Sequence, residues 1–269
     1  VYKRQDEGLS AFNLGFSGQK VDATRALIEN TLERLDVKIA IVETNPDMLT
    51  RIASGSGRQW LELGIYSPEA AHGLSYGLES GQLDQMLMVA GRHIRPSVPR
   101  LRNKDESDSQ LADAITLVTK CRYISGGYCE WKHPIEKEQL KRLRKRVSTN
   151  KPKKGRKIPS QALLELRSIL ELLQKRDIRP VLVVAPISQE YMERTGEDTL
   201  ADWAETLSQF ASKHDVSLFN YLTPELALSL RTEEHFLDEH HLSQAGVEIF
   251  NANLLDNLRK TAIIDETTR

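Results

Sequence analysis

The chain has few cysteines, few aromatic residues and almost no net charge, and each shortage excludes a class of protein. Two cysteines among 269 residues exclude a disulfide-rich scaffold. Lys+Arg number 37 and Asp+Glu 38, so the formal net charge of −1 disfavours a basic nucleic-acid-binding protein. No apolar run approaches the roughly 20 residues that span a bilayer. The 39% of hydrophobic residues is nevertheless enough for a sizeable core.

The two cysteines, Cys121 and Cys129, flank the turn sequence Ser125-Gly126-Gly127. A hairpin at this turn would bring them together as a disulfide, which implies an oxidising compartment. The alternative is a pair of thiols packed within an insertion. Two cysteines alone do not decide between these interpretations.

The first 45 residues alternate between strand and helix patterns. Residues 11–16 are typical of a short strand that ends in a turn. From Val21 to Leu35 the apolar residues fall at helical spacing, and residues 37–42 form an aliphatic run that Asn45-Pro46 ends. Strand, helix and strand in this order predict a βαβ unit with a parallel sheet.

The last third repeats this alternation. Ser160 is expected to cap a helix from Gln161 to about Lys175, and a buried strand follows at residues 181–185. A helix over residues 199–213, a strand over residues 216–219 and a final helix from near Ser243 to about Lys260 complete the pattern. The fold class predicted is α/β: a three-layer α/β/α sandwich with a parallel sheet and right-handed crossovers.

The chain divides into three parts. Residues 1–53 and 158–269 form the two parts of the α/β domain, and residues 54–157 are a long insertion, a lid or a substrate surface. The insertion ends in a basic cluster over Lys141–Lys157. This cluster is a solvated linker or a contact with anionic lipid headgroups at a membrane surface. No aromatic residues interleave with its charges, which argues against nucleic acid as a partner.

The segment Asp238-Glu-His-His241 carries the residues of an acid–base pair. A serine nucleophile needs a histidine base, and the base needs a carboxylate that fixes its tautomer. An aspartate three residues before the histidine lets one tight turn present both side chains together. The alternative is a metal site that uses the adjacent His240 and His241, with Glu239 and His235 nearby. Adjacent histidines cannot share one face of a helix or strand, however, and no second ligand cluster appears.

Two other polar segments follow predicted strands. Asn13-Leu-Gly-Phe-Ser-Gly-Gln19 supplies a glycine-containing turn whose N–H groups could stabilise an oxyanion, and Glu43-Thr-Asn-Pro46 follows the next strand. Ligands of an open parallel sheet bind beyond the carboxyl ends of its strands. We therefore expect these two segments and Asp238–His241 to meet at one edge of the sheet.

Together these motifs, with the late Phe236-Leu-Asp-Glu-His-His-Leu-Ser-Gln-Ala-Gly246, resemble the SGNH/GDSL hydrolases. The resemblance is closest to the cell-envelope, O-acetyltransferase-like subtype, and it covers about half of the chain. It implies a flavodoxin-like sandwich and a serine esterase or O-acyltransferase that acts on ester-linked acyl groups of glycans, without metal or cofactor, in the bacterial envelope or periplasm. Asp238 and His241 would be its acid and base, and Gly18 and Asn45 its oxyanion donors.

The nucleophile departs from the family pattern. The family's serine follows the first strand in a G-D-S or G-S-S turn, and no such motif precedes Asn13. Ser10 and Ser17 lack a suitable strand or elbow. We expect the chain to begin just after the catalytic serine and to lack the first, central strand. The alternative function is a non-catalytic α/β binding or scaffold domain.

Overall fold

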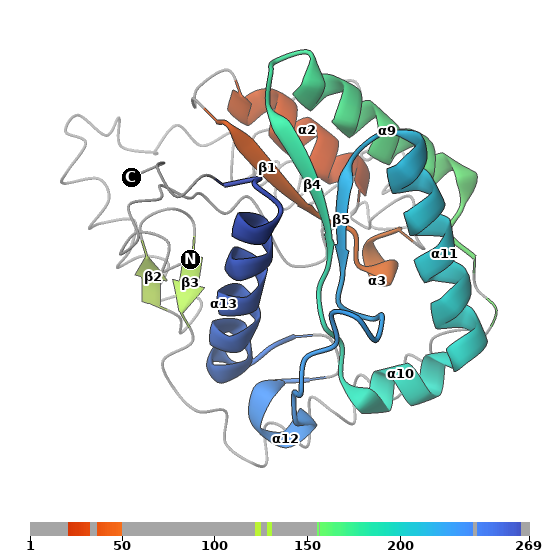
Figure 1. Ribbon diagram of the computed structural model, residues 1–269, viewed down its shortest axis with the longest axis vertical. Helices are drawn as coiled ribbons and strands as arrows, with labels where there is room; N and C mark the ends of the chain where they lie inside the picture. Colours follow the sequence, from red (N-terminus) through yellow and green to blue (C-terminus); the bar gives the residue numbers. More distant parts are fainter. Residues whose placement is uncertain are drawn as a thin grey trace, which may run out of the picture.

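A computed structural model describes residues 21–32, 37–49, 122–124, 128–130, 155, 157–238 and 241–264. Its main sheet has three strands in the order β1-β4-β5, all parallel (Figure 1). The strands are β1 (Ile39–Glu43), β4 (Arg179–Val184) and β5 (Ser217–Asn220). Helices pack on both faces of this sheet, so the predicted α/β class is confirmed.

The register of the strands sorts their side chains onto two faces. Ile41 pairs with Val181, and Val183 pairs with Phe219. Because successive side chains in a strand point to opposite faces, the odd-numbered positions of all three strands share one face and the even-numbered positions share the other. Five of the six β4 residues are buried, as expected of a central strand covered on both sides.

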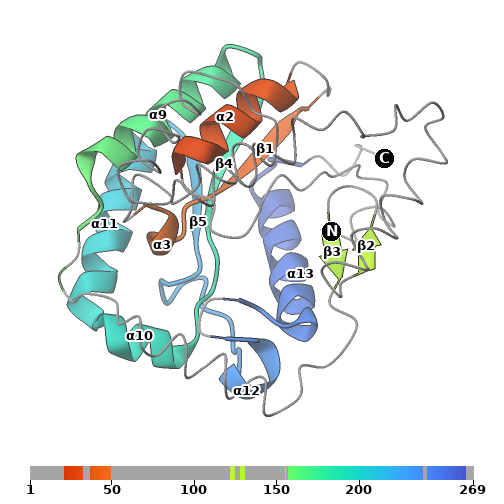
Figure 2. The same ribbon diagram turned by 180° about the vertical axis from the view of Figure 1, so that it is seen from behind.

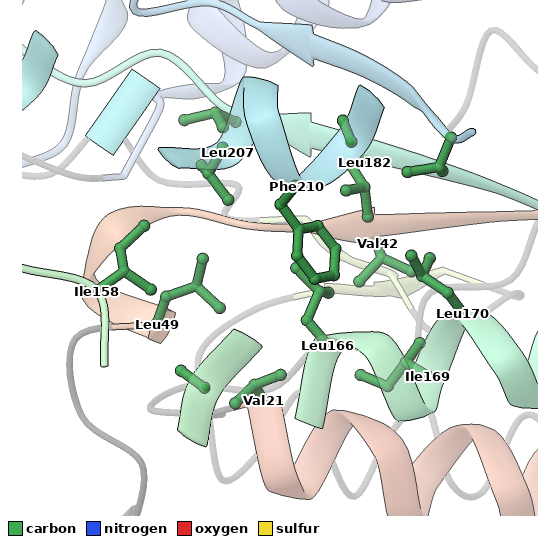
Figure 3. Close-up of a cluster of buried hydrophobic side chains, with 14 of the residues drawn as sticks. Val21, Val42, Leu49, Ile158, Leu166, Ile169, Leu170, Leu182, Leu207 and Phe210 are labelled. Carbon is green, nitrogen blue, oxygen red and sulfur yellow. The ribbon is translucent and has the colours of Figure 1, made fainter. Parts of the chain in front are cut away.

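The even-numbered face carries the larger core. It is covered by α2 (Val21–Leu32), α9 (Ser160–Gln174) and α11 (Glu197–Lys213). Apolar residues at helical spacing in α9 and α11 meet Val42 and Leu182 of the sheet (Figure 3). The labelled members of this cluster are Val21, Val42, Leu49, Ile158, Leu166, Ile169, Leu170, Leu182, Leu207 and Phe210. An ion pair between Arg25 and Glu165, 3.2 Å apart, joins α2 to α9.

The odd-numbered face is covered by the last helix, α13 (Gln244–Lys260) (Figure 2). Leu254 and Leu258 pack against Val181, Val183 and Phe219. Polar contacts at the edge of this contact hold the helix in place, since Tyr221 Oη donates to Asn253 Oδ1 at 3.0 Å and Asn257 Nδ2 donates to Tyr221 Oη at 3.2 Å. Burial raises the pKa of Tyr221, and the hydrogen bond from Asn257 opposes that rise.

Most elements expected in the described segments form within two or three residues of their predicted bounds. The cap of α9 is an exception: Pro159 occupies the N-cap position, and Ser160 is the first helical residue. The expected capping role of Ser160 is therefore wrong, because proline already sets the extended backbone that precedes the helix. Three short helices were not expected: α3 (Pro46–Leu49), α10 (Gln189–Thr195) and α12 (Thr232–His235).

The insertion contributes a hairpin of β2 (Arg122–Ile124) and β3 (Tyr128–Glu130) around the predicted turn. Its register pairs Cys129 with Tyr123, while Cys121 lies outside the described residues, so the disulfide stays a prediction. Of the basic cluster Lys141–Lys157, only Gly155 and Lys157 are described. No helix in the described segments is both long enough and apolar enough to cross a membrane.

Candidate active site

The carboxyl ends of the three strands lie at one end of the sheet, together with α10, α12 (Thr232–His235) and the beginning of α13 (Figure 1). A buried polar residue lies at or after the end of each strand: Thr44 follows β1, Ser188 lies in the loop after β4, and Asn220 is the last residue of β5. These residues stabilise the turns. Thr44 Oγ1 donates to the Val183 carbonyl at 3.2 Å, Ser188 Oγ accepts from the first turn of α10, and Asn220 Oδ1 accepts from Leu222 N at 3.0 Å. The turns at this edge of the sheet are therefore fixed by buried hydrogen bonds.

A closed loop between α12 and α13 carries Asp238 and His241. Phe236, which is buried, forms an antiparallel bridge with Leu242. The N–H of Leu237 donates to the His241 carbonyl at 2.8 Å, and the N–H of Ser243 donates to the His235 carbonyl at 2.8 Å. These two hydrogen bonds make up the bridge and hold the two arms of the loop together, and Asp238 and His241 lie on the loop between them.

The Asp238 carboxylate makes two kinds of contact with His241. Its Oδ1 accepts the backbone N–H of His241 at 2.9 Å. The ring Nδ1 lies 2.8 Å from Oδ1 and 2.7 Å from Oδ2. The aspartate side chain is 12% exposed and the histidine side chain is 67% exposed. The carboxylate is therefore sheltered and fixed by the turn, while the imidazole extends toward solvent.

This geometry gives His241 the chemistry of a general base. A carboxylate at Nδ1 favours the tautomer that carries its proton there. Nε2 is then the ring nitrogen with the lone pair, and it can take a proton from a hydroxyl. The same carboxylate stabilises the imidazolium that results. The structure brings together the two residues predicted as acid and base.

The first turn of α13 packs tightly beneath this loop. Ser243 is the N-cap of this helix: its Oγ accepts from Gly246 N at 3.3 Å and donates to the Glu234 carbonyl at 2.7 Å. A Cβ atom at Gly246 would lie 2.2 Å from the His235 carbonyl oxygen and 3.0 Å from Leu242 Cδ2. Glycine is thus required at this position because the backbone of α12 passes directly over it.

Replacing Gly246 with alanine is expected to destabilise the fold by about 1–3 kcal/mol, because a backbone carbonyl has to move aside. Denaturant unfolding measures the change. Without this contact the same substitution inside a helix would be stabilising by about 1 kcal/mol. The sign of the change in unfolding free energy therefore shows whether the backbone of α12 lies against Gly246. A more stable variant would contradict the close approach of α12 to α13.

Glu43 is a third ionisable residue at this edge, at the end of β1. Its side chain keeps solvent-accessible surface, yet the protein around the carboxyl group removes enough water to raise its pKa. The positive charge of His241 opposes this rise. The carboxyl group of Glu43 therefore interacts electrostatically with the imidazole of His241, which belongs to a loop far away in the sequence.

The other predicted site residues have separate outcomes. Gly18 lies outside the described residues, as do Ser10 and Ser17. Asn45 is half-buried after β1, and its carbonyl accepts from Met48 N at 2.9 Å and from Leu49 N at 3.3 Å, which begins α3. Asn45 thus stands at the expected edge of the sheet, and its role as an oxyanion donor stays a prediction.

The metal interpretation finds no ligand set in the described part of the chain. No group of three or more histidine, cysteine or acidic side chains is gathered there as a metal site would require. His235 is engaged in the turn instead, since its Nδ1 accepts from Arg231 N at 2.8 Å. Glu239 and His240 lie outside the described residues.

The sequence pattern predicts that the segment containing Glu43 lies at this edge, but it assigns no role to Glu43 itself. The signal available was a carboxylate directly after an aliphatic strand. Comparison with known proteins adds no assignment: no family model matches the chain, and no curated protein matches it.

Proposed function

We propose that this chain carries the acid–base half of an SGNH-type serine esterase or O-acyltransferase. The substrates are ester-linked acyl groups, with acetyl groups on cell-surface glycans as the preferred class. The observation that supports this proposal is the Asp238–His241 pair, in which a sheltered carboxylate contacts Nδ1 of an exposed imidazole at 2.7 Å. Its position at the carboxyl edge of a parallel sheet is where ligands bind in such folds.

In the proposed reaction a serine oxygen attacks the ester carbonyl carbon, and its proton moves to Nε2 of His241. Asp238 stabilises the imidazolium throughout. The tetrahedral intermediate collapses, the proton passes to the leaving alkoxide, and an acyl-enzyme remains. Water or a sugar hydroxyl then attacks the acyl group by the same proton transfers, so one set of residues serves hydrolysis and transfer.

The remaining parts of this machinery are also proposals. Gly18 and Asn45 would donate hydrogen bonds to the oxyanion. The nucleophile would stand in a G-x-S turn encoded upstream of Val1, on a strand that adds to the same sheet. Ser17, in the segment Gly15-Phe-Ser-Gly18, is the candidate between Val1 and Arg269.

Labelling by a fluorophosphonate probe tests this function on a protein extended upstream of Val1. We expect covalent labelling at a single serine, located by peptide mass spectrometry, together with turnover of p-nitrophenyl acetate. A variant with that serine replaced by alanine is the matched control and should take up no label. An extended protein that neither reacts with the probe nor turns over the ester would favour the non-catalytic binding or scaffold domain.

A further inference from the structure

The position of Glu43 follows from the alternation of side chains along β1. Ile39 packs with Val181 and Leu258 in the core beneath α13, whereas Val42 packs in the core on the other face. Glu43 is four residues after Ile39, so it has the same parity and points to the α13 face of the sheet. It is also the last residue of its strand, at the carboxyl edge.

His241 lies at the carboxyl edge of the sheet because it precedes α13. It lies three residues before Gln244, the first residue of α13, and α13 begins at the carboxyl edge of the sheet (Figure 1). Glu43 and His241 therefore share one end and one face of the sheet. Ile41 and Glu43 are both exposed, because α13 covers the odd-numbered face over β4 and β5 and leaves the end of β1 open among the described residues.

We propose that Glu43 is a positioning residue of this site, whose carboxylate stabilises the imidazolium form of His241 while the base holds the proton of the nucleophile. This role rests on the proposed function and adds a second carboxylate to it. Asp238 fixes the tautomer through Nδ1 by direct hydrogen bonding. Glu43 acts through space from a neighbouring strand, and it sets how readily His241 takes up a proton.

Among the described residues around His241, several charged side chains already have partners. On its own loop the partner is Asp238. On α12, Arg231 and Glu234 form an ion pair with each other, and His235 accepts from the backbone of Arg231. On α13, Glu248 accepts from Gln244. Glu43 is the charged group of β1. The protein around its carboxyl group removes water and raises its pKa, and the positive charge of His241 opposes that rise.

Coupling between two titrating groups is reciprocal, and this makes the proposal testable without any ester turnover. A carboxylate that stabilises the imidazolium must itself be stabilised by the imidazolium to the same extent. Removing either charge should therefore shift the titration of the other by the same amount and in opposite directions.

The experiment is an NMR titration of the histidine ring protons in the unmodified chain and in Glu43→Gln. A His241→Gln variant assigns the His241 signal among the seven histidines. We expect His241 to titrate at lower pH in Glu43→Gln than in the unmodified chain. In the converse measurement, the carbon-13 signal of the Glu43 carboxyl group should titrate at higher pH in His241→Gln, by an equal shift.

The matched control is Glu205→Gln, an exposed glutamate on α11, which covers the other face of the sheet. It should leave the His241 titration unchanged. Glutamine has nearly the shape of glutamate, and Thr44 N still donates to the Val183 carbonyl at 2.7 Å, so β1 should stay paired in Glu43→Gln. A His241 titration that is identical in Glu43→Gln and the unmodified chain, with the fold intact, would overturn the proposal.

Kinetics separates this proposal from the proposed function. In a protein extended upstream and active on p-nitrophenyl acetate, Glu43→Gln should move the acidic limb of the kcat/KM profile to lower pH. It should also lower kcat about three- to tenfold with little change in KM. Reciprocal NMR shifts in a protein with no esterase activity would support the coupling while contradicting the function. An unmoved acidic limb in an active protein would count against Glu43 alone.

Discussion

Replacing His241 with alanine is expected to lower the kcat for ester turnover about 10⁴- to 10⁶-fold in a protein extended upstream of Val1. The imidazole is the group that takes the proton of the nucleophile in the proposed reaction, and Nδ1 is already committed to Asp238 at 2.7 Å. Without the imidazole, a hydroxyl has to attack as a weak nucleophile. Steady-state kinetics with p-nitrophenyl acetate measures the loss.

The fold should survive this substitution. The His241 side chain is 67% exposed, so its removal opens no cavity. The backbone N–H that donates to Asp238 Oδ1 is present in alanine as well. The thermal midpoint should therefore stay unchanged. The matched control is His214→Ala, which removes a ring that packs on Phe210 at the end of α11 and should keep its ester turnover. Equal turnover in His241→Ala and the unmodified protein would refute the assignment of the base.

The spacing of apolar residues predicts the longer helices and the buried strand, because these elements depend on residues close together in the sequence. The helix α9 was expected because Leu166, Leu170 and Leu173 recur at helical spacing, and all three are buried in the structure. The strand β4 was expected from its unbroken aliphatic run. The helix α10 was missed because it is only seven residues long, and its one clear signal is the cap Ser188, whose Oγ accepts from Tyr191 N at 3.2 Å.

In the site, too, contacts within one turn can be predicted from the sequence, whereas contacts between distant segments cannot. Asp238 and His241 could be paired from the sequence because one turn joins them, and the spacing of three residues itself allows the contact. Glu43 could not be assigned to them, because its approach to His241 depends on the strand order and on the face that α13 covers. Gly246 is similar: its small size matters only because the His235 carbonyl lies where a Cβ would stand.

Replacing Asp238 with asparagine should be nearly as damaging as losing the base, with a fall in kcat of about 10³- to 10⁴-fold. Both carboxylate oxygens lie close to the ring Nδ1 of His241, Oδ1 at 2.8 Å and Oδ2 at 2.7 Å. Oδ1 also accepts the backbone N–H of His241 at 2.9 Å. An asparagine can keep the contacts of Oδ1 with its oxygen, so the turn should persist. Its amide nitrogen then stands where Oδ2 was.

At the Oδ2 position that exchange replaces an acceptor by a donor. An amide N–H placed there opposes a second N–H at Nδ1, so the favoured tautomer of His241 is the one in which Nδ1 accepts and Nε2 carries the ring proton. Nε2 then carries a hydrogen where the reaction needs a lone pair, and the imidazole no longer accepts the proton of the nucleophile. The thermal midpoint should match that of the unmodified protein, and KM should change little, whereas kcat falls. An asparagine variant that retains most of its kcat would show that the second carboxylate oxygen does not fix the tautomer of His241, because the substitution preserves the contacts of Oδ1 and changes that of Oδ2.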